Sequence, residues 1–354
     1  MAAIPLYPLP EQPPRFLLLK RFLYRGIWGK YPFYRCGRTG IISQRERAIS
    51  KVLYSFGLIV AAGYLWRFFE PGGLDRQRVR HALNMTVLHF FLPALAFGLV
   101  ATAKVDRTFL AVPLIAAAVT LLSLAAGTAV YRWLPWYRAA PRPVIGVLLL
   151  SAAFGNVTYL GLPVITETLG SRYGYIAILY DLLATTPVLL TVGVLTAARF
   201  GSGGTVSLAA SFRRILKLPP LWGVALGIAA HAVPVPKMVL DAAQLMGRAV
   251  IPVMIFTVGL ALDFQDIKRL PVALPALALK LILAPVLAWL FARAAGMSGD
   301  ILQAVVIEGA MPVMVLSLVL ADEFELDVPL AATCIAVSTA ASFFTLPMMM
   351  KVLF

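Results

Sequence analysis

The chain has 354 residues, of which 60% are hydrophobic and only 13% are charged. A soluble domain carries about 25% charged residues and about 45–50% apolar residues, so this composition excludes an ordinary water-soluble fold and favours the bilayer as solvent. The formal charge is +15, yet the basic residues lie in the first segment and between apolar runs. Membrane proteins place Lys and Arg at such positions, and we therefore exclude nucleic acid as a partner.

Residues 1–47 form a basic tail that is rich in Pro, Arg and Tyr. Its apolar stretch, residues 16–28, is interrupted by Lys20, Arg21 and Arg25, so it is too charged to span a membrane. Two interpretations stay open: a disordered tail outside the working protein, or an interfacial anchor whose basic side chains reach lipid headgroups.

After the tail, apolar runs recur along the whole chain, and most are long enough to cross a hydrocarbon core of about 30 Å as helices. We predict an all-α integral membrane protein, with the lipid bilayer around about ten spans. The predicted spans are residues 50–69, 77–103, 108–131, 143–169, 173–198, 219–233, 238–262, 271–295, 299–321 and 328–352.

The spans divide into two groups of five, residues 48–200 and 218–354, joined by a short central loop at 201–217. The groups are loosely similar: Phe91-Leu-Pro in the second span resembles Val250-Ile-Pro in the seventh, and the fourth and ninth spans each contain a central proline. An odd number of helices forces the second group to insert upside down. This pattern predicts two inverted five-helix repeats, an architecture of transporters.

Loop charges predict an orientation. Outside the tail, Lys and Arg are concentrated in the odd-numbered connections and in the central loop. The positive-inside rule then places the central loop in the cytoplasm and both ends of the core outside, in a plasma membrane or bacterial inner membrane. The basic tail contradicts this orientation, because its Lys and Arg residues would have to cross the membrane. Either the tail is inserted independently of the charge bias or the number of spans differs by one.

Helix-breaking and polar residues are concentrated in the middle of the fourth span. Gly155, Asn156, Thr158, Gly161 and Pro163 lie within nine residues of an apolar run. An unpaired backbone group in a bilayer costs several kcal/mol, so a broken helix is tolerated only where packing or a cavity satisfies the freed groups.

The ninth span has a similar centre, in which Glu308 and Gly309 precede Met311 and Pro312. One such span is equally typical of a simple kink. Two at equivalent places favour a small-molecule site, because the ends of the half-helices and the freed backbone groups then face one cavity.

Three ionisable residues lie inside apolar runs: Asp181, Lys280 and Glu308. A charge at the bilayer centre costs at least about 2.5–3.5 kcal/mol, so each needs a partner, a cavity or a shifted pKa. Lys280 could attract an anion, and either carboxyl group could carry a proton or bind sodium as the coupling ion. The alternative is a static ion pair that joins two helices.

The chain contains no HExxH pattern, P-loop, nucleophile elbow or Rossmann glycine pattern. The histidines His81, His89 and His231 are scattered, and Cys36 lies far from Cys334, so no metal-ligand spacing is present. We therefore expect no enzymatic activity, no catalytic residue, no metal and no organic cofactor.

Residues 155–163, Gly-Asn-Val-Thr-Tyr-Leu-Gly-Leu-Pro, resemble the Gly-Asn-x-Gly-x-x-Gly-x-Pro motif of the auxin efflux carrier family. Thr158 stands where the family usually has glycine. Shorter similarities follow in order over residues 50–354: Gly63-Tyr-Leu, Gly73-Leu-Asp75, Phe91-Leu-Pro93-Ala-Leu, Tyr180-Asp181, Lys280 before Pro285, and Ala310-Met311-Pro312. The short central loop is similar to that of bacterial members.

This resemblance implies the fold shared with bile-acid symporters and sodium/proton antiporters. Broken helices four and nine would cross at the substrate site. Spans one, two, six and seven would form a scaffold that makes a homodimer, and the other spans would move as an elevator. The implied substrates are organic anions such as auxin, or dicarboxylates such as malonate and malate.

The sequence therefore predicts a transporter of a small organic anion. The expected substrate contacts are Asn156, Thr158, Gly161, Pro163, Met311 and Pro312, with Asp181, Lys280 and Glu308 supplying charge or coupling. Two alternatives stay open: a sodium- or proton-coupled cation antiporter or symporter of the same fold, and a membrane sensor that binds a ligand without moving it.

Overall fold

The computed structural model describes residues 38–137, 140–202, 207–264 and 266–354. Residues 1–37 of the predicted tail therefore lie outside the described residues. The chain divides into two compact units, Met1–Ser43 and Gln44–Phe354. Of the first unit, only the helical residues 38–43 are described, and the rest of the fold belongs to the second.

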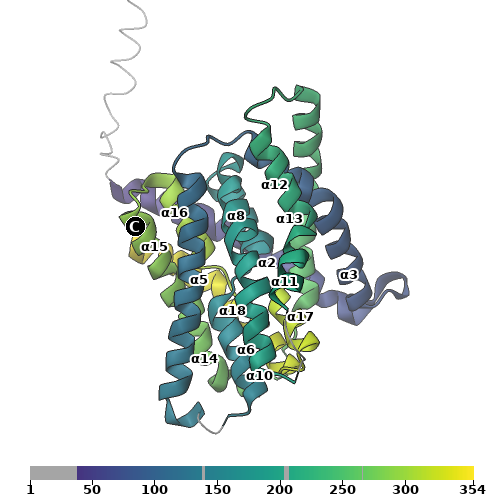
Figure 1. The fold of residues 1–354 in the computed structure, drawn as a ribbon, viewed down its shortest axis with the longest axis vertical. Coiled ribbons are helices and arrows are strands. Elements are labelled where there is room, and N and C mark those ends of the chain that lie inside the picture. The colour runs from purple at the N-terminus through teal and green to yellow at the C-terminus, as the bar shows by residue number, and fades with distance from the viewer. Residues whose placement is uncertain (1–37, 138–139, 203–206, 265) are drawn as a thin grey trace, which may run out of the picture. The chain divides into compact units, whose positions relative to one another are not determined.

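Helices account for nearly all of the described chain (Figure 1). The α-helices are α2 (Arg38–Phe69), α3 (Arg76–Thr86), α4 (Leu92–Ala101), α5 (Thr108–Trp133), α6 (Arg142–Ala153), α7 (Leu162–Thr168), α8 (Gly174–Tyr180), α9 (Thr186–Val188), α10 (Val194–Phe200), α11 (Leu208–Leu216), α12 (Pro219–Ala229), α13 (Lys237–Ala261), α14 (Leu270–Ala278), α15 (Ala284–Ala294), α16 (Gly299–Gly309), α17 (Leu316–Glu323) and α18 (Val328–Leu353). Five π-helical turns interrupt or join them: η2 (Val87–Phe91), η4 (Val157–Gly161), η6 (Asp181–Thr185), η7 (Leu189–Gly193) and η9 (Leu279–Leu283). Short 3₁₀ turns complete the connections: η1 (Pro71–Gly73), η3 (Pro135–Tyr137), η5 (Ser171–Tyr173) and η8 (Ile267–Arg269).

Within the described residues, seven helices are long and apolar enough to cross a membrane. They are Lys51–Phe69, Arg76–Ala101, Thr108–Trp133, Ser171–Phe200, Lys237–Ala261, Ile267–Ala294 and Val328–Leu353. The prediction of an all-helical integral membrane protein is thereby confirmed. On α5, Leu110, Leu114 and Leu121 are exposed while Val112 and Val119 are buried, as expected of a helix with one face toward lipid.

The predicted fourth, sixth and ninth spans do not appear among these long helices. The fourth consists of α6 followed by η4 and α7, and the ninth of α16 followed by α17. Their shortness has a local cause: Gly155 and Asn156 lie at the break of the fourth span, and Gly309 and Pro312 lie at the break of the ninth. The sixth is α12, which has 11 residues.

The predicted central loop at 201–217 contains a helix, α11. The side chain of Ser207 accepts a hydrogen bond from the backbone N–H of Ala210 and so caps its first turn. Ser211 and Ile215 are buried while Phe212 is exposed. This helix carries basic side chains in its last turn and leads into α12.

The second unit contains two groups of packed helices. In one, α4 packs against α12 and α13, and α3 packs against α13. In the other, α5 packs against α6, α8 and α15, while α16 packs against α15 and α8. The interrupted helices both belong to the second group.

Candidate functional site

The two interrupted helices meet at their interruptions. Between α6 and η4 the chain is extended at residues 154–156, and it pairs with the residues that follow α16. The backbone N–H of Asn156 donates to the carbonyl oxygen of Pro312 at 2.7 Å, and that of Met314 donates to the carbonyl oxygen of Phe154 at 3.0 Å. These two bonds, with the bridge between Gly155 and Val313, satisfy backbone groups that the breaks set free.

We call this pairing of residues 154–156 with residues 312–314 the crossing. Side chains from two further helical segments bind at or next to it. The backbone N–H of Val313 donates to Oγ of Ser338 on α18 at 3.0 Å. The ammonium group of Lys280 donates to the carbonyl oxygen of Gly309 at 2.8 Å, at the C-terminal end of α16. A cation at that end is favourable, because the last carbonyl groups of a helix are unsatisfied and carry partial negative charge.

Gly155 makes room for Lys280. A Cβ atom at Gly155 would lie 2.7 Å from Cε of Lys280, closer than real Cβ atoms approach. A side chain at this position would push Lys280 away from its contact with Gly309, which gives the first glycine of the motif a packing role.

Glu308 is fully buried, and its carboxyl group lies against Gly161, where a Cβ atom would overlap it. Neither of its oxygens has a hydrogen-bond partner in the described part of the chain. No ion pair joins Glu308 to Lys280 among the described residues, although the two groups interact electrostatically. Burying an acidic group without a hydrogen-bond partner is costly, so Glu308 stands out among the buried side chains.

Asp181 opens the π-helical turn η6 and faces η4. The hydroxyl of Thr158 donates to one of its carboxyl oxygens, and the hydroxyl of Thr186 donates to the other at 2.7 Å. Thr158, Asp181 and Lys280 all lie in π-helical turns, which often mark functional positions in helices.

A cavity of about 370 Å³ lies beside the crossing. Of the nine predicted site residues, Asn156, Thr158 and Asp181 line it. The other lining residues include polar side chains of α3 and many apolar ones: Arg80, His81, Asn84, Met85, Leu88, Leu92, Tyr159, Leu182, Thr186, Leu189, Leu190, Leu218, Pro220, Met314, Val315, Leu316, Leu318 and Val319. Its volume suits a small organic molecule.

The amide nitrogen Nδ2 of Asn156 has no hydrogen-bond partner among the described residues, and the residue is 3% exposed. Leaving a buried donor unpaired costs about 1–3 kcal/mol. Because Asn156 also lines the cavity, its amide is a candidate donor to a ligand acceptor.

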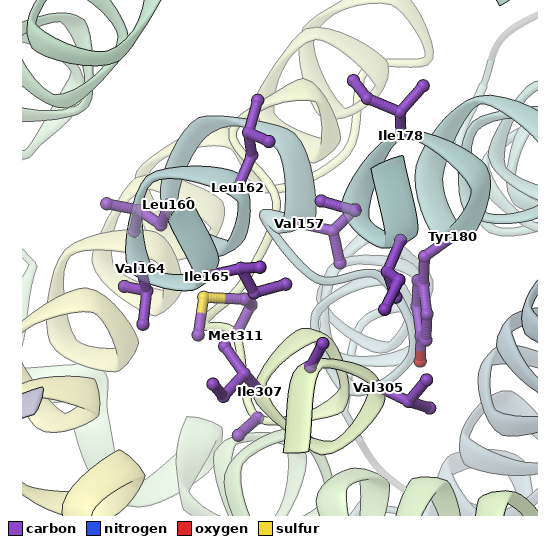
Figure 2. Close-up of a cluster of buried hydrophobic side chains, with 14 of the residues drawn as sticks. Val157, Leu160, Leu162, Val164, Ile165, Ile178, Tyr180, Val305, Ile307 and Met311 are labelled. Carbon is purple, nitrogen blue, oxygen red and sulfur yellow. The ribbon is translucent and has the colours of Figure 1, made fainter. Parts of the chain in front are cut away.

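The remaining predicted residues lie away from the cavity lining. Pro312 contributes its backbone oxygen to the crossing, and Pro163 lies in the first turn of α7, where proline is well tolerated. Figure 2 shows Met311 in a cluster of buried apolar side chains with Ile165 and Ile307. Met311 thus packs the two interrupted helices against each other.

Sequence reasoning missed several polar cavity residues, among them Arg80, His81 and Asn84 on α3. A signal was present, since Arg80, Asn84 and Leu88 recur at the four-residue spacing of one helix face.

These features define an integral membrane protein in which two interrupted helices meet beside a small-molecule cavity. Residues 204–350 match the model of a family described as membrane transport protein. This match and the two relatives described next bear out the predicted resemblance to the auxin efflux carrier family.

An uncharacterized transporter of Methanothermobacter thermautotrophicus is 27% identical over 310 residues, which cover 86% of this chain and 98% of that protein. An uncharacterized transporter of Methanocaldococcus jannaschii is 25% identical over 295 residues, which cover 80% of this chain and 92% of that protein. Family and relatives point to a transporter rather than an enzyme.

Proposed function

We propose that this protein is a secondary transporter that carries a small organic anion and binds it in the cavity beside the crossing. The observation that carries the proposal is the unpartnered Nδ2 of buried Asn156 at the cavity wall. A carboxylate oxygen is the acceptor that such a donor lacks. Thr158 and Asp181 complete the polar wall, and the crossing bonds of Pro312 hold Asn156 in place.

The proposed architecture has ten spans in two inverted repeats, with α6–α7 and α16–α17 as the fourth and ninth. The helix group of α3, α4, α12 and α13 would be the scaffold and the homodimer surface, and the group around the crossing would move as an elevator. The helices of each group pack mainly against one another, with smaller contacts across the groups such as those of α4 with α8 and of α13 with η4, and this supports the division. Gly161, Pro163 and Met311 would act through the packing of the moving part.

We propose that the central segment is cytoplasmic, in a plasma membrane or bacterial inner membrane. The cavity lining includes Leu218 and Pro220, which directly follow that segment, and Arg80 in the first half of α3. The cavity would then open toward the cytoplasm.

Coupling to an ion is a second proposal about the same site. Asp181 with the hydroxyl oxygens of Thr158 and Thr186 offers the hard oxygen ligands that sodium prefers, while Glu308 with its unpaired oxygens suits a proton. A cation-coupled or cation-transporting protein of the same fold would show flux that depends on sodium or on a pH gradient. Flux that depends neither on sodium nor on a pH gradient would indicate a uniporter.

The test is uptake of labelled carboxylates, including indole-3-acetate, malonate and malate, by proteoliposomes. Asn156→Ala should weaken apparent affinity about tenfold or more, because a hydrogen bond to a charged group contributes about 1.5–3 kcal/mol. Ser123→Ala is the matched control, since Ser123 Oγ is also buried and unpartnered among the described residues but lies in α5, outside the cavity lining. Unchanged uptake by the Asn156 variant would contradict the site.

A further inference from the structure

Three arginines lie on the first turns of α3, and two of them have acidic partners. The guanidinium of Arg76 lies 2.7 Å from a carboxylate oxygen of Asp263, and that of Arg78 lies 3.1 Å from Asp75. Arg80 forms no ion pair or hydrogen bond with any residue that the structure describes. Its charge is therefore available to a ligand.

Arg80 is half-buried and lines the cavity together with Asn84, one helical turn further along α3. It also lines a neighbouring cavity of about 220 Å³, so the residue borders both cavities. Among the described residues that line the larger cavity, Arg80 is the one with a permanent positive charge. An unpaired guanidinium in such a place is expected to bind a carboxylate through two parallel hydrogen bonds.

The rest of the cavity offers no second cationic end. His81 adjoins Arg80, and the lining also contains Asp181, an acidic group that provides no countercharge for a carboxylate. Most of the other lining residues are leucine, methionine and valine. A second carboxylate would lose its hydration there without gaining a countercharge.

We propose that Arg80 binds the single carboxylate of the substrate, and that the site therefore selects an acid with one carboxylate and an apolar body over a dicarboxylate. This inference rests on the proposed function and deepens it, because it names the substrate class and the specificity-determining residue. Asn156, which also lines the cavity, then donates to a second acceptor or to the same carboxylate.

The test is binding to purified protein, measured by calorimetry and by ligand-dependent thermal shift. The probes are hexanoate and 3-phenylpropionate, the neutral amide of each, and adipate, which has the chain length of hexanoate and a second carboxylate. Wild-type protein should bind each monocarboxylate at least about tenfold more tightly than its amide, which lacks the charge, and than adipate, whose second carboxylate finds no countercharge.

Arg80→Gln should remove the preference for acid over amide, whereas Arg80→Lys should retain part of it. Arg78→Gln is the matched control, because Arg78 lies on the same helix but is paired with Asp75 and largely exposed. Since Arg80 has no partner among the described residues, its replacement leaves no described group unpaired, and the variants should unfold at the wild-type temperature.

Two results would overturn the inference while the proposed function survives. One is an Arg80→Gln variant that still prefers acid to amide as the wild type does. The other is a wild type that binds adipate as tightly as hexanoate. A wild type that binds none of the carboxylates, although folded, would contradict the proposed function as well.

Discussion

Thr158 and Asp181 show how a hydroxyl supports a buried acid at the cavity wall. The Thr158 hydroxyl donates to Asp181 across two π-helical turns, and both residues are almost fully buried. Its removal leaves one carboxyl oxygen of Asp181 without that donor, so stability and ligand binding should both respond.

We predict that Thr158→Val lowers the free energy of unfolding by about 1.5–3 kcal/mol, the usual contribution of a hydrogen bond to an acidic group. Thr158→Ser keeps the hydroxyl and is the control. The measurement is denaturant-induced unfolding in mixed micelles. Equal stabilities of the valine and serine variants would show that the hydrogen bond contributes nothing.

Gly161 and Glu308 form a second pair whose coupling can be measured. A Cβ atom at Gly161 would overlap the buried Glu308 carboxyl group. Gly161→Ala should therefore destabilise the wild type by about 1–3 kcal/mol through overpacking, and clearly less in a Glu308→Ala background. Additive effects in this double-mutant cycle would contradict the contact.

At the residue scale, some cavity residues could be predicted from the sequence, whereas others and their contacts could not. Asn156 was identified because an amide beside helix breakers is conspicuous in an apolar run. Arg80 was missed because a basic residue near a helix end looks like an interfacial charge. The contact of Lys280 with the α16 terminus depends on long-range packing, which one-dimensional patterns do not contain.

At the scale of elements, the crossing depends on hydrogen bonds between segments far apart in sequence. Ser338 on α18 accepts from the backbone N–H of Val313 and donates to the carbonyl oxygen of Ile335. One turn later, Ser342 donates only within its own helix, to Thr339. Both serines have a buried hydroxyl group, but only that of Ser338 bonds to the crossing. Comparing their alanine variants therefore distinguishes the loss of a bond at the crossing from the mere loss of a buried hydroxyl group.

We predict that Ser338→Ala destabilises the protein by about 1–3 kcal/mol and slows transport, because it leaves the Val313 N–H unpaired at the crossing. Ser342→Ala should change stability by less than about 1 kcal/mol and leave transport intact. Thermal unfolding and proteoliposome flux measure the two effects. A reversed order of the variants would show that Ser338 does not support the crossing.

The interruptions themselves could be predicted, since Gly, Asn and Pro in the middle of an apolar run are costly unless a cavity or partner satisfies the backbone. The break in the fourth span lies at Gly155 and Asn156, whereas Pro163 begins a regular helix. The sequence could not predict which residues pair, namely 154–156 with 312–314, because three-dimensional packing sets the register of this pairing.

At the scale of the molecule, the membrane orientation gives a separate prediction. Val105 and Phe212 are both exposed, the first between α4 and α5 and the second on α11. With Cys36 and Cys334 replaced, Phe212→Cys should react with an impermeant thiol reagent only from the cytoplasmic side, and Val105→Cys only from outside. Labelling from the opposite sides would invert the proposed orientation.

Composition and apolar runs sufficed to predict a helical membrane protein, since the bilayer imposes span length and internal hydrogen bonding. They could not give the lengths of the interrupted helices, nor the helix α11 within the predicted central loop. Both depend on local capping and on tertiary contacts, as at Ser207 and Asn156.

The most direct test of the central claim is ligand protection of a thiol inside the cavity. Val319 lines the cavity and is 52% exposed, so Val319→Cys in the cysteine-free background should react readily with a small thiol reagent. If the cavity is the anion site, 3-phenylpropionate should slow this reaction in a saturable manner, without slowing that of Val105→Cys. Protection of neither thiol by a carboxylate that the protein demonstrably transports would contradict the account and place the substrate elsewhere.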